Sequence, residues 1–166
     1  MRIFLYYSQG NNLLTGFSMK NRYGFILMML LMLMSCGRGY KQFSLLSHKR
    51  TGITFRNTVQ ETEEFNHLAY SYLYNGAGVA IGDLNNDGLP DIYFTGNLVR
   101  SRLYLNRGNF RFKDISQEAG VSASDTWNNG ACMADVNGDG FLDIYVCSST
   151  DGRQKYRKNL LFINNG

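Results

Sequence analysis

Proline, histidine and long apolar runs are all scarce in this chain. Of its 166 residues only one is proline and two are histidine, whereas 18 are glycine. Glycine must therefore supply most of the turns. The apolar run Phe25–Met34 is unbroken, but it is shorter than the roughly 18–20 residues that a membrane-spanning helix needs. Its length excludes a bilayer-crossing helix at this point.

Signatures of common catalytic and cofactor sites are missing as well. The sequence contains no nucleophile elbow, no Walker loop and no dinucleotide-binding fingerprint. His48 and His67 show no zinc-binding spacing, so we expect both at the surface. These residues therefore predict no enzyme, although a catalytic region could lie in sequence that follows them.

The formal charge of +4 comes mainly from the amino-terminal end. Arg2, Lys20 and Arg22 lie in the first 35 residues, where there is no acidic residue. From Cys36 onward 14 basic residues stand against 13 acidic ones, a net charge of +1. The basic run Arg153–Lys158 is short enough to be a solvated loop. We expect no nucleic-acid partner.

The amino-terminal segment predicts export. Lys20 and Arg22 precede the apolar run, and Leu33-Met34-Ser35-Cys36 follows it. A basic region, a short apolar region and a small residue in this order are typical of a secretory signal peptide. The alternative is a buried apolar helix with an incidental cysteine. We assign residues 1–35 to the signal peptide, with translation starting at Met1 or at Met19.

The Leu-x-Ser-Cys ending resembles the bacterial lipobox. The resemblance implies that Cys36 becomes the lipidated first residue of the mature protein. Because acyl chains contribute about 0.8 kcal/mol per buried CH₂, several chains would hold the protein firmly on a membrane. We therefore predict an exported bacterial lipoprotein of the outer membrane or cell surface, with residues 36–51 as its tether.

Residues 52–166 contain an internal repeat. The stretch 78–94 matches 130–146 at an offset of 52 residues, and 103–106 matches 161–164 at an offset of 58. The larger offset reflects six additional residues. They fall in the polar stretch around Asp151–Lys158, and we expect that stretch to be a loop.

Short segments rich in β-branched and aromatic residues predict a structure made almost entirely of strands. Turns with glycine or asparagine separate them, and residues 61–74 permit either a helical turn or a long loop. The expected strands are Ile53–Val59, Gly78–Ile81, Ile92–Thr95, Arg102–Leu105, Phe110–Ile115, Ala131–Ala134, Ile144–Cys147 and Leu160–Ile163.

Four short strands in about 50 residues are typical of a β-propeller blade. Such blades need neighbours, because one blade cannot bury both faces of its sheet. The sequence supplies about two blades and reaches a turn at residues 164–166 without a returning strand. We therefore predict an all-β fold consisting of blades of an incomplete propeller, truncated at the carboxyl terminus. The alternative is a complete small β-domain.

Two loops between predicted strands share the pattern D-x-N-x-D-G-x-x-D. Calcium takes six to eight oxygen ligands, and a tightly curled loop can bring positions 1, 3, 5, 7 and 9 together. An EF-hand is excluded because position 12 is Phe94 or Val146 instead of glutamate, and the flanks are strands. A metal-free turn is the alternative. The predicted calcium ligands are Asp83, Asn85, Asp87, Leu89 (carbonyl) and Asp91, and Asp135, Asn137, Asp139, Phe141 (carbonyl) and Asp143.

The stretch 78–94 resembles the FG-GAP/VCBS-type repeat, which builds calcium-binding propellers such as the head of integrin α-chains. The resemblance covers residues 53–166 and implies that the eight ligand side chains bind calcium. Asn85 and Asn137 replace a common aspartate, which lowers the charge of each site. Together with the predicted lipid anchor, this leads to the hypothesis of a surface-anchored module that binds a protein or a glycan. The alternative is the amino-terminal part of a propeller-type carbohydrate-active enzyme.

Two cysteines and several aromatic residues complete the list of candidates. Cys132 and Cys147 flank the second loop, and export permits a disulfide between them. The first repeat has Ala80 and Thr95 instead, so we expect two small buried thiols. We expect four aromatic residues to pack in the core or at the rim of a blade, and the alternative is stacking on sugars. These residues are Trp127, Tyr70, Tyr72 and Tyr74.

Overall fold

The computed structural model describes residues 23–24, 26–28, 41–123, 126–149 and 158–166. The chain divides into two units, Met1–Ser44 and Leu45–Gly166. In the first unit, residues 23–24 and 26–28 are helical and exposed. No helix in these described residues is long and apolar enough to cross a membrane. Most of the predicted signal peptide, and Cys36 with it, lies outside the described residues.

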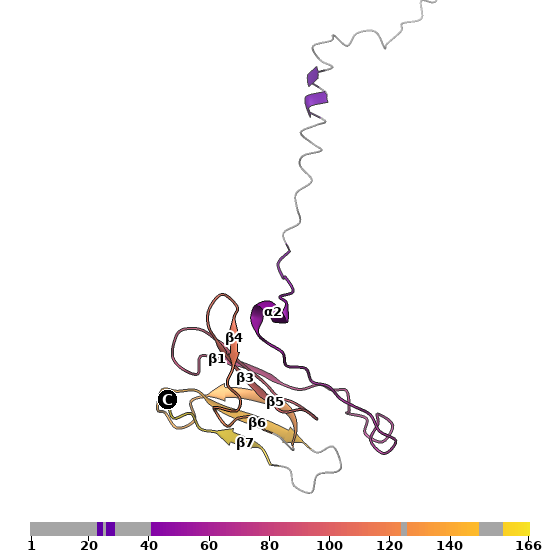
Figure 1. Cartoon of the computed structure of the whole chain (residues 1–166), viewed down its shortest axis with the longest axis vertical. Coiled ribbons are helices and arrows are strands. Elements are labelled where there is room, and N and C mark those ends of the chain that lie inside the picture. The colour runs from indigo at the N-terminus through magenta and orange to yellow at the C-terminus, as the bar shows by residue number, and fades with distance from the viewer. Residues whose placement is uncertain (1–22, 25, 29–40, 124–125, 150–157) are drawn as a thin grey trace, which may run out of the picture. The chain divides into compact units, whose positions relative to one another are not determined.

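The second unit begins with one helical turn, α2 (His48–Thr51), inside the segment predicted as a tether. The Ser47 side chain caps it by accepting a hydrogen bond from the amide of Arg50. Gly52 ends it with a φ of 78°, a backbone conformation that glycine adopts without steric cost. The seven strands that follow in the described residues, from Val79 onward, form two antiparallel sheets (Figure 1).

The first sheet is a four-stranded meander whose strands are neighbours in chain order. Ile81 pairs with Ile92, and Ile92 pairs in turn with Tyr104, so one register runs across the sheet. Its strands are β1 (Val79–Gly82), β2 (Asp91–Phe94), β3 (Arg102–Asn106) and β4 (Phe112–Asp114).

The second sheet repeats this plan with three strands in the described residues. They are β5 (Trp127–Ala134), β6 (Asp143–Ser149) and β7 (Leu160–Phe162). Seven of the eight expected strands are therefore confirmed, and the all-β prediction with them. The predicted loop around residues 151–158 falls almost wholly outside the described residues.

The expected strand Ile53–Val59 is wrong, because these residues belong to neither sheet. The segment still alternates between half-buried and exposed residues, as a strand does. Contacts with side chains of the first sheet hold this segment in place instead. The amide of Thr54 donates to the Tyr104 hydroxyl at 3.3 Å, and Phe55 stacks on Phe94 with ring centroids 5.1 Å apart.

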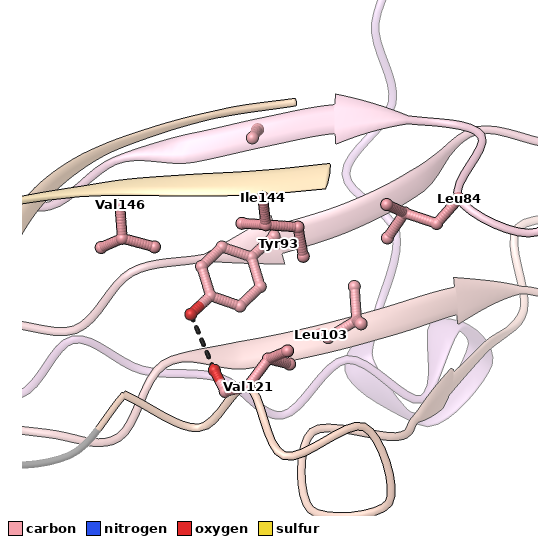
Figure 2. Packing of buried hydrophobic residues seen from close by; sticks show 7 residues of the cluster. Leu84, Tyr93, Leu103, Val121, Ile144 and Val146 are labelled. Atoms are coloured by element: carbon pink, nitrogen blue, oxygen red, sulfur yellow. Dashed lines mark hydrogen bonds between the residues drawn. The ribbon is translucent and has the colours of Figure 1, made fainter. Parts of the chain in front are cut away.

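The main core lies between the two sheets (Figure 2). Because successive strand residues point to opposite faces, alternate residues of β2, β3 and β6 meet there. Tyr93 is fully buried, and its hydroxyl donates to the Val121 carbonyl at 2.8 Å. Burial raises the pKa of Tyr93 to about 12. The buried members of this cluster are Ala80, Leu84, Tyr93, Leu103, Val121, Ile144 and Val146.

A second cluster forms around Trp127, which is 2% exposed. Phe65 and Leu73, from the turn-rich segment 61–74, are buried against it. The structure thus confirms a long loop for this segment and a core role for Trp127. Tyr70 packs against this cluster, whereas Tyr72 and Tyr74 are exposed, at 64% and 65%.

The expectation of buried thiols is wrong, because Cys132 and Cys147 are both free and exposed. Cys132 lies opposite Tyr145, and Cys147 lies opposite Gly130. By strand alternation both cysteines lie on the face of the second sheet that points away from the main core. His48 and His67 are exposed, as expected.

The first strands of the two sheets approach each other at two glycines. A Cβ atom on Gly78 would lie 2.5 Å from the Cα of Gly130. No side chain fits at so short a distance. Glycine at Gly78 therefore allows β1 and β5 to approach closely.

Candidate metal centre

The first aspartate loop connects β1 to β2, and Asp83 organises its backbone. Asp83 Oδ1 accepts from the amide of Asp87 at 3.1 Å, and its Oδ2 accepts from the amide of Gly88 at 2.8 Å. These bonds curl the loop around one carboxylate. Gly88 has a φ of 82°, which explains the glycine at position 6.

Asn85 and Asp87 are joined directly within this loop. The Asn85 Nδ2 donates to Asp87 Oδ2 at 3.0 Å, and Asn85 Oδ1 accepts from the amide of Asp87 at 3.2 Å. Asp87 Oδ1 accepts from the amide of Leu89 at 2.9 Å. Asp83 and Asn85 thus share the amide of Asp87 as donor, and Asn85 also donates to the Asp87 carboxylate, while the binding of an ion by these three side chains stays a prediction. The role of the Leu89 carbonyl stays a prediction.

Asp91, at position 9, is the first residue of β2 and is fully buried. Its Oδ2 accepts from the amide of Leu84 at 3.0 Å, and its Oδ1 accepts from the amide of Asn106 at 2.8 Å. Burial raises the pKa of Asp91, and the negative charges of Asp87 and Asp83 raise it further. The hydrogen bonds from the amides of Asn106 and Leu84 lower it. Asp91 therefore ties the loop to β3.

The second loop, between β5 and β6, reproduces this arrangement. Asp135 Oδ1 accepts from the amides of Gly138 and Asp139 at 2.7 and 3.2 Å, and Oδ2 accepts from Gly140 at 2.9 Å. The amide of Gly140 contributes most to lowering the pKa of Asp135. Asn137 Nδ2 donates to Asp139 Oδ2 at 2.8 Å.

The remaining positions of the second loop also match the first. The amide of Phe141 donates to Asp139 Oδ1 at 2.9 Å, while the role of the Phe141 carbonyl stays a prediction. Asp143 is 1% exposed. It accepts from the amides of Val136 and Asn164 at 2.9 and 2.8 Å. Two loops 52 residues apart in the sequence therefore build the same arrangement of hydrogen bonds around their aspartates. We call this arrangement the cradle.

Sequence reasoning missed two asparagines that support these cradles. Asn106 and Asn164 give their backbone amides to Asp91 and Asp143. Their side chains also donate to backbone carbonyls, Asn106 to Pro90 at 3.0 Å and Asn164 to Leu142 at 3.2 Å. The signal was present, because both residues end the repeated blocks 103–106 and 161–164.

The two loops also contact each other, which spacing alone did not predict. The Asn86 Nδ2 donates to the Gly140 carbonyl at 3.1 Å. The Asn164 Nδ2 donates to the Leu84 carbonyl at 2.7 Å. The predicted sites therefore lie at the same edge of the packed sheets.

In the described residues the predicted ligands are not arranged as a preformed metal site. Among the described residues, no group of three or more His, Cys, Asp or Glu side chains is placed to hold a metal ion. In the first loop, backbone amides occupy the Asp83 oxygens and Asp91 is turned towards Leu84 and Asn106. The donor set still fits a hard cation, because ionised carboxylates accept at about four sites and every predicted ligand is an oxygen.

These features define the class of protein. Two packed antiparallel sheets, each with an aspartate loop of the same D-x-N-x-D-G-x-x-D pattern after its first strand, are repeated blades of an all-β protein. Residues 83–146 match a family model described as an FG-GAP-like repeat. The match spans both loops and confirms the predicted resemblance for this part of the chain.

Curated relatives match about half of the chain. Cartilage acidic protein 1 of Homo sapiens is 30% identical over 93 residues, which are 49% of this chain and 14% of the relative. Cartilage acidic protein 1 of Xenopus tropicalis is 28% identical over 93 residues, with the same coverage. The matched region thus spans only 14% of the length of these relatives.

Proposed function

We propose that this chain is a calcium-binding repeat module of a surface-anchored lipoprotein, and that it binds a protein or a glycan. One observation carries the calcium assignment: the D-x-N-x-D-G-x-x-D cradle occurs twice with the same internal hydrogen bonds. A turn that only reversed the chain would not need three carboxylates at each of two equivalent places.

In the proposed site the first loop holds the ion with Asp83, Asn85, Asp87, Asp91 and the carbonyl of Leu89. The second loop uses Asp135, Asn137, Asp139, Asp143 and the carbonyl of Phe141. Calcium, when bound, supplies the positive charge that offsets the mutual repulsion of three carboxylates. Backbone amides occupy the carboxylate oxygens of Asp83 and Asp87, so these residues would hold an ion only by giving up part of those contacts, which would link metal binding to loop order.

The calcium assignment is tested by calorimetry or terbium luminescence on the full chain. The paired substitution Asp87→Ala and Asp139→Ala removes one carboxylate from each loop and should abolish saturable binding. The matched control is Glu63→Ala with Glu64→Ala, which removes two exposed acids outside the loops. If the unaltered chain takes up no divalent ion, the assignment is wrong.

The partner assignment has a separate test. Tyr72 and Tyr74 expose large aromatic surfaces, which suit stacking on a sugar ring or packing against a protein. We expect a protein or glycan ligand on a binding array, with loss of signal for Tyr72→Ala combined with Tyr74→Ala. An array without any ligand would reduce the module to a structural spacer.

The anchor assignment concerns Cys36. Labelled palmitate should enter the protein in a bacterial host and should be lost with Cys36→Ala. Cys132→Ala is the matched control, because it removes an exposed free thiol elsewhere in the chain. Label that persists in Cys36→Ala would overturn the lipoprotein assignment.

A further inference from the structure

Asn86 is the only residue of the first aspartate loop, in the described structure, whose side chain donates a hydrogen bond to the second. It occupies position 4, and its Nδ2 reaches the carbonyl of Gly140 at 3.1 Å. That carbonyl belongs to the same peptide group as the amide of Phe141, which donates to Asp139 Oδ1 at 2.9 Å. One peptide group therefore joins Asn86 to a predicted ligand of the neighbouring loop.

The two loops differ at position 4 in a way that isolates this contact. The backbone is left-handed at both positions, with a φ of 56° at Asn86 and 77° at Gly138. A Cβ atom on Gly138 would meet no other atom of the described residues within 4 Å. Both positions thus have a left-handed backbone conformation, and only the first loop carries a side chain there. That side chain reaches the other loop.

A second contact runs in the opposite direction. The backbone amide of Asn164 donates to Asp143 Oδ1, and its side chain donates to the Leu84 carbonyl of the first loop. The amide of Leu84 in turn donates to Asp91 Oδ2 at 3.0 Å. The buried carboxylates at position 9 of the two loops are therefore connected through Asn164 and Leu84.

We propose that Asn86 couples the two loops, so that a divalent ion bound in either loop raises the affinity of the other. This inference rests on the proposed calcium function. The Asn86–Gly140 bond forms only when both loops hold their curled shape, so ordering one loop lowers the entropic cost of ordering the other. By thermodynamic linkage the effect is reciprocal, because each site must change the other's affinity by the same factor.

The experiment measures calcium affinity at the first loop by calorimetry, with and without a working second loop. Asp139→Ala disables the second loop. In the chain with Asn86, we expect this change to weaken binding at the first loop by roughly two- to tenfold, the scale of one neutral hydrogen bond. In the Asn86→Gly chain the loss caused by Asp139→Ala should be smaller, because only the connection through Asn164 and Leu84 then remains. Glycine suits the positive φ, so the substitution adds no backbone strain.

Asn109→Gly is the matched control. Asn109 is exposed, has a φ of 53° and lies in the turn between β3 and β4, so its substitution makes the same chemical change outside the loops. The coupling should survive it. A second readout is amide hydrogen exchange at Phe141 in excess calcium, which should be faster in Asn86→Gly than in Asn109→Gly.

The outcomes separate the two proposals. If the unaltered chain binds no calcium, the proposed function is overturned and the coupling with it. If the chain binds calcium and Asp139→Ala weakens the first loop equally in the Asn86 and Asn86→Gly backgrounds, only the role of Asn86 is overturned. The same holds if Asp139→Ala leaves the first loop unchanged in both.

Discussion

At the scale of single residues, Asp91 and Asp143 do more than their spacing suggests. The pattern predicts metal ligands at position 9, and the structure shows buried carboxylates that each accept two backbone amides. One of these amides comes from the same loop, and the other comes from Asn106 or Asn164. Local spacing could predict the first contact, but the second depends on how the third strand of each sheet folds back.

Tyr93 supports a prediction about stability in neutral solution. Its hydroxyl satisfies the Val121 carbonyl inside the core. Tyr93→Phe removes that donor and leaves the carbonyl unpaired, so the free energy of unfolding should fall by about 1–2 kcal/mol at pH 7. Urea unfolding checks this, with Tyr72→Phe as the control, because Tyr72 is exposed. Equal losses in the two variants would contradict the role given to the buried bond.

The same residue predicts a dependence on alkaline pH. The pKa of Tyr93 rises from 10.0 to about 12 on burial, so the unfolded chain loses this proton first. Stability therefore falls as pH rises from about 10 to about 12, by at most about 3 kcal/mol from this residue. Tyr93→Phe lacks that loss. The gap in unfolding free energy between the parent and the variant should shrink across this pH range, and a constant gap would contradict the prediction.

At the scale of elements, sequence alone predicted the strands that pair with a chain neighbour. β1 to β7 each contain β-branched or aromatic residues and lie beside a turn, so local pattern was enough. Ile53–Val59 has the same pattern but joins no sheet among the described residues. The pattern of β-branched and aromatic residues indicates which segments suit a strand. It does not report whether a partner strand lies beside them.

The cysteines show a similar limit. Strand alternation correctly places Cys132 and Cys147 on one face of the second sheet, but it does not say what covers that face. The core lies on the opposite face, so both thiols are exposed in the described structure.

The approach of β1 to β5 gives a prediction about elements. Gly78→Ala would place a methyl group 2.5 Å from the Cα of Gly130, a contact with backbone that cannot yield cheaply. We expect a loss of about 1–3 kcal/mol in unfolding free energy, the usual cost of overpacking. Gly130→Ala is the matched control, since its Cβ would lie 3.8 Å from the Cβ of Cys147. The prediction fails if Gly130→Ala is as destabilising as Gly78→Ala.

At the scale of the whole unit Leu45–Gly166, the two sheets share one core and one edge. Ile144 and Val146 of the second sheet pack against Tyr93 and Leu103 of the first (Figure 2). The aspartate loops lie at the edge of this core, with Leu84 buried in it. Because the backbone amide of Leu84 also donates a hydrogen bond to the Asp91 carboxylate, loop order and core packing are linked.

This link predicts that calcium stabilises the folded unit as a whole. An ion that binds only the folded loops raises the unfolding free energy by RT ln(1 + [Ca²⁺]/Kd), or about 2.7 kcal/mol per site at 100 times Kd. The melting temperature should therefore rise steadily with the logarithm of calcium concentration and fall when chelator is added. Asp87→Ala combined with Asp139→Ala should flatten this dependence, whereas Glu63→Ala combined with Glu64→Ala should preserve it. A melting temperature that is independent of calcium, in a chain that calorimetry shows to bind it, would mean that the loops order without support from the core. In that case the hydrogen bond between Leu84 and Asp91 would not transmit loop order to the packed sheets.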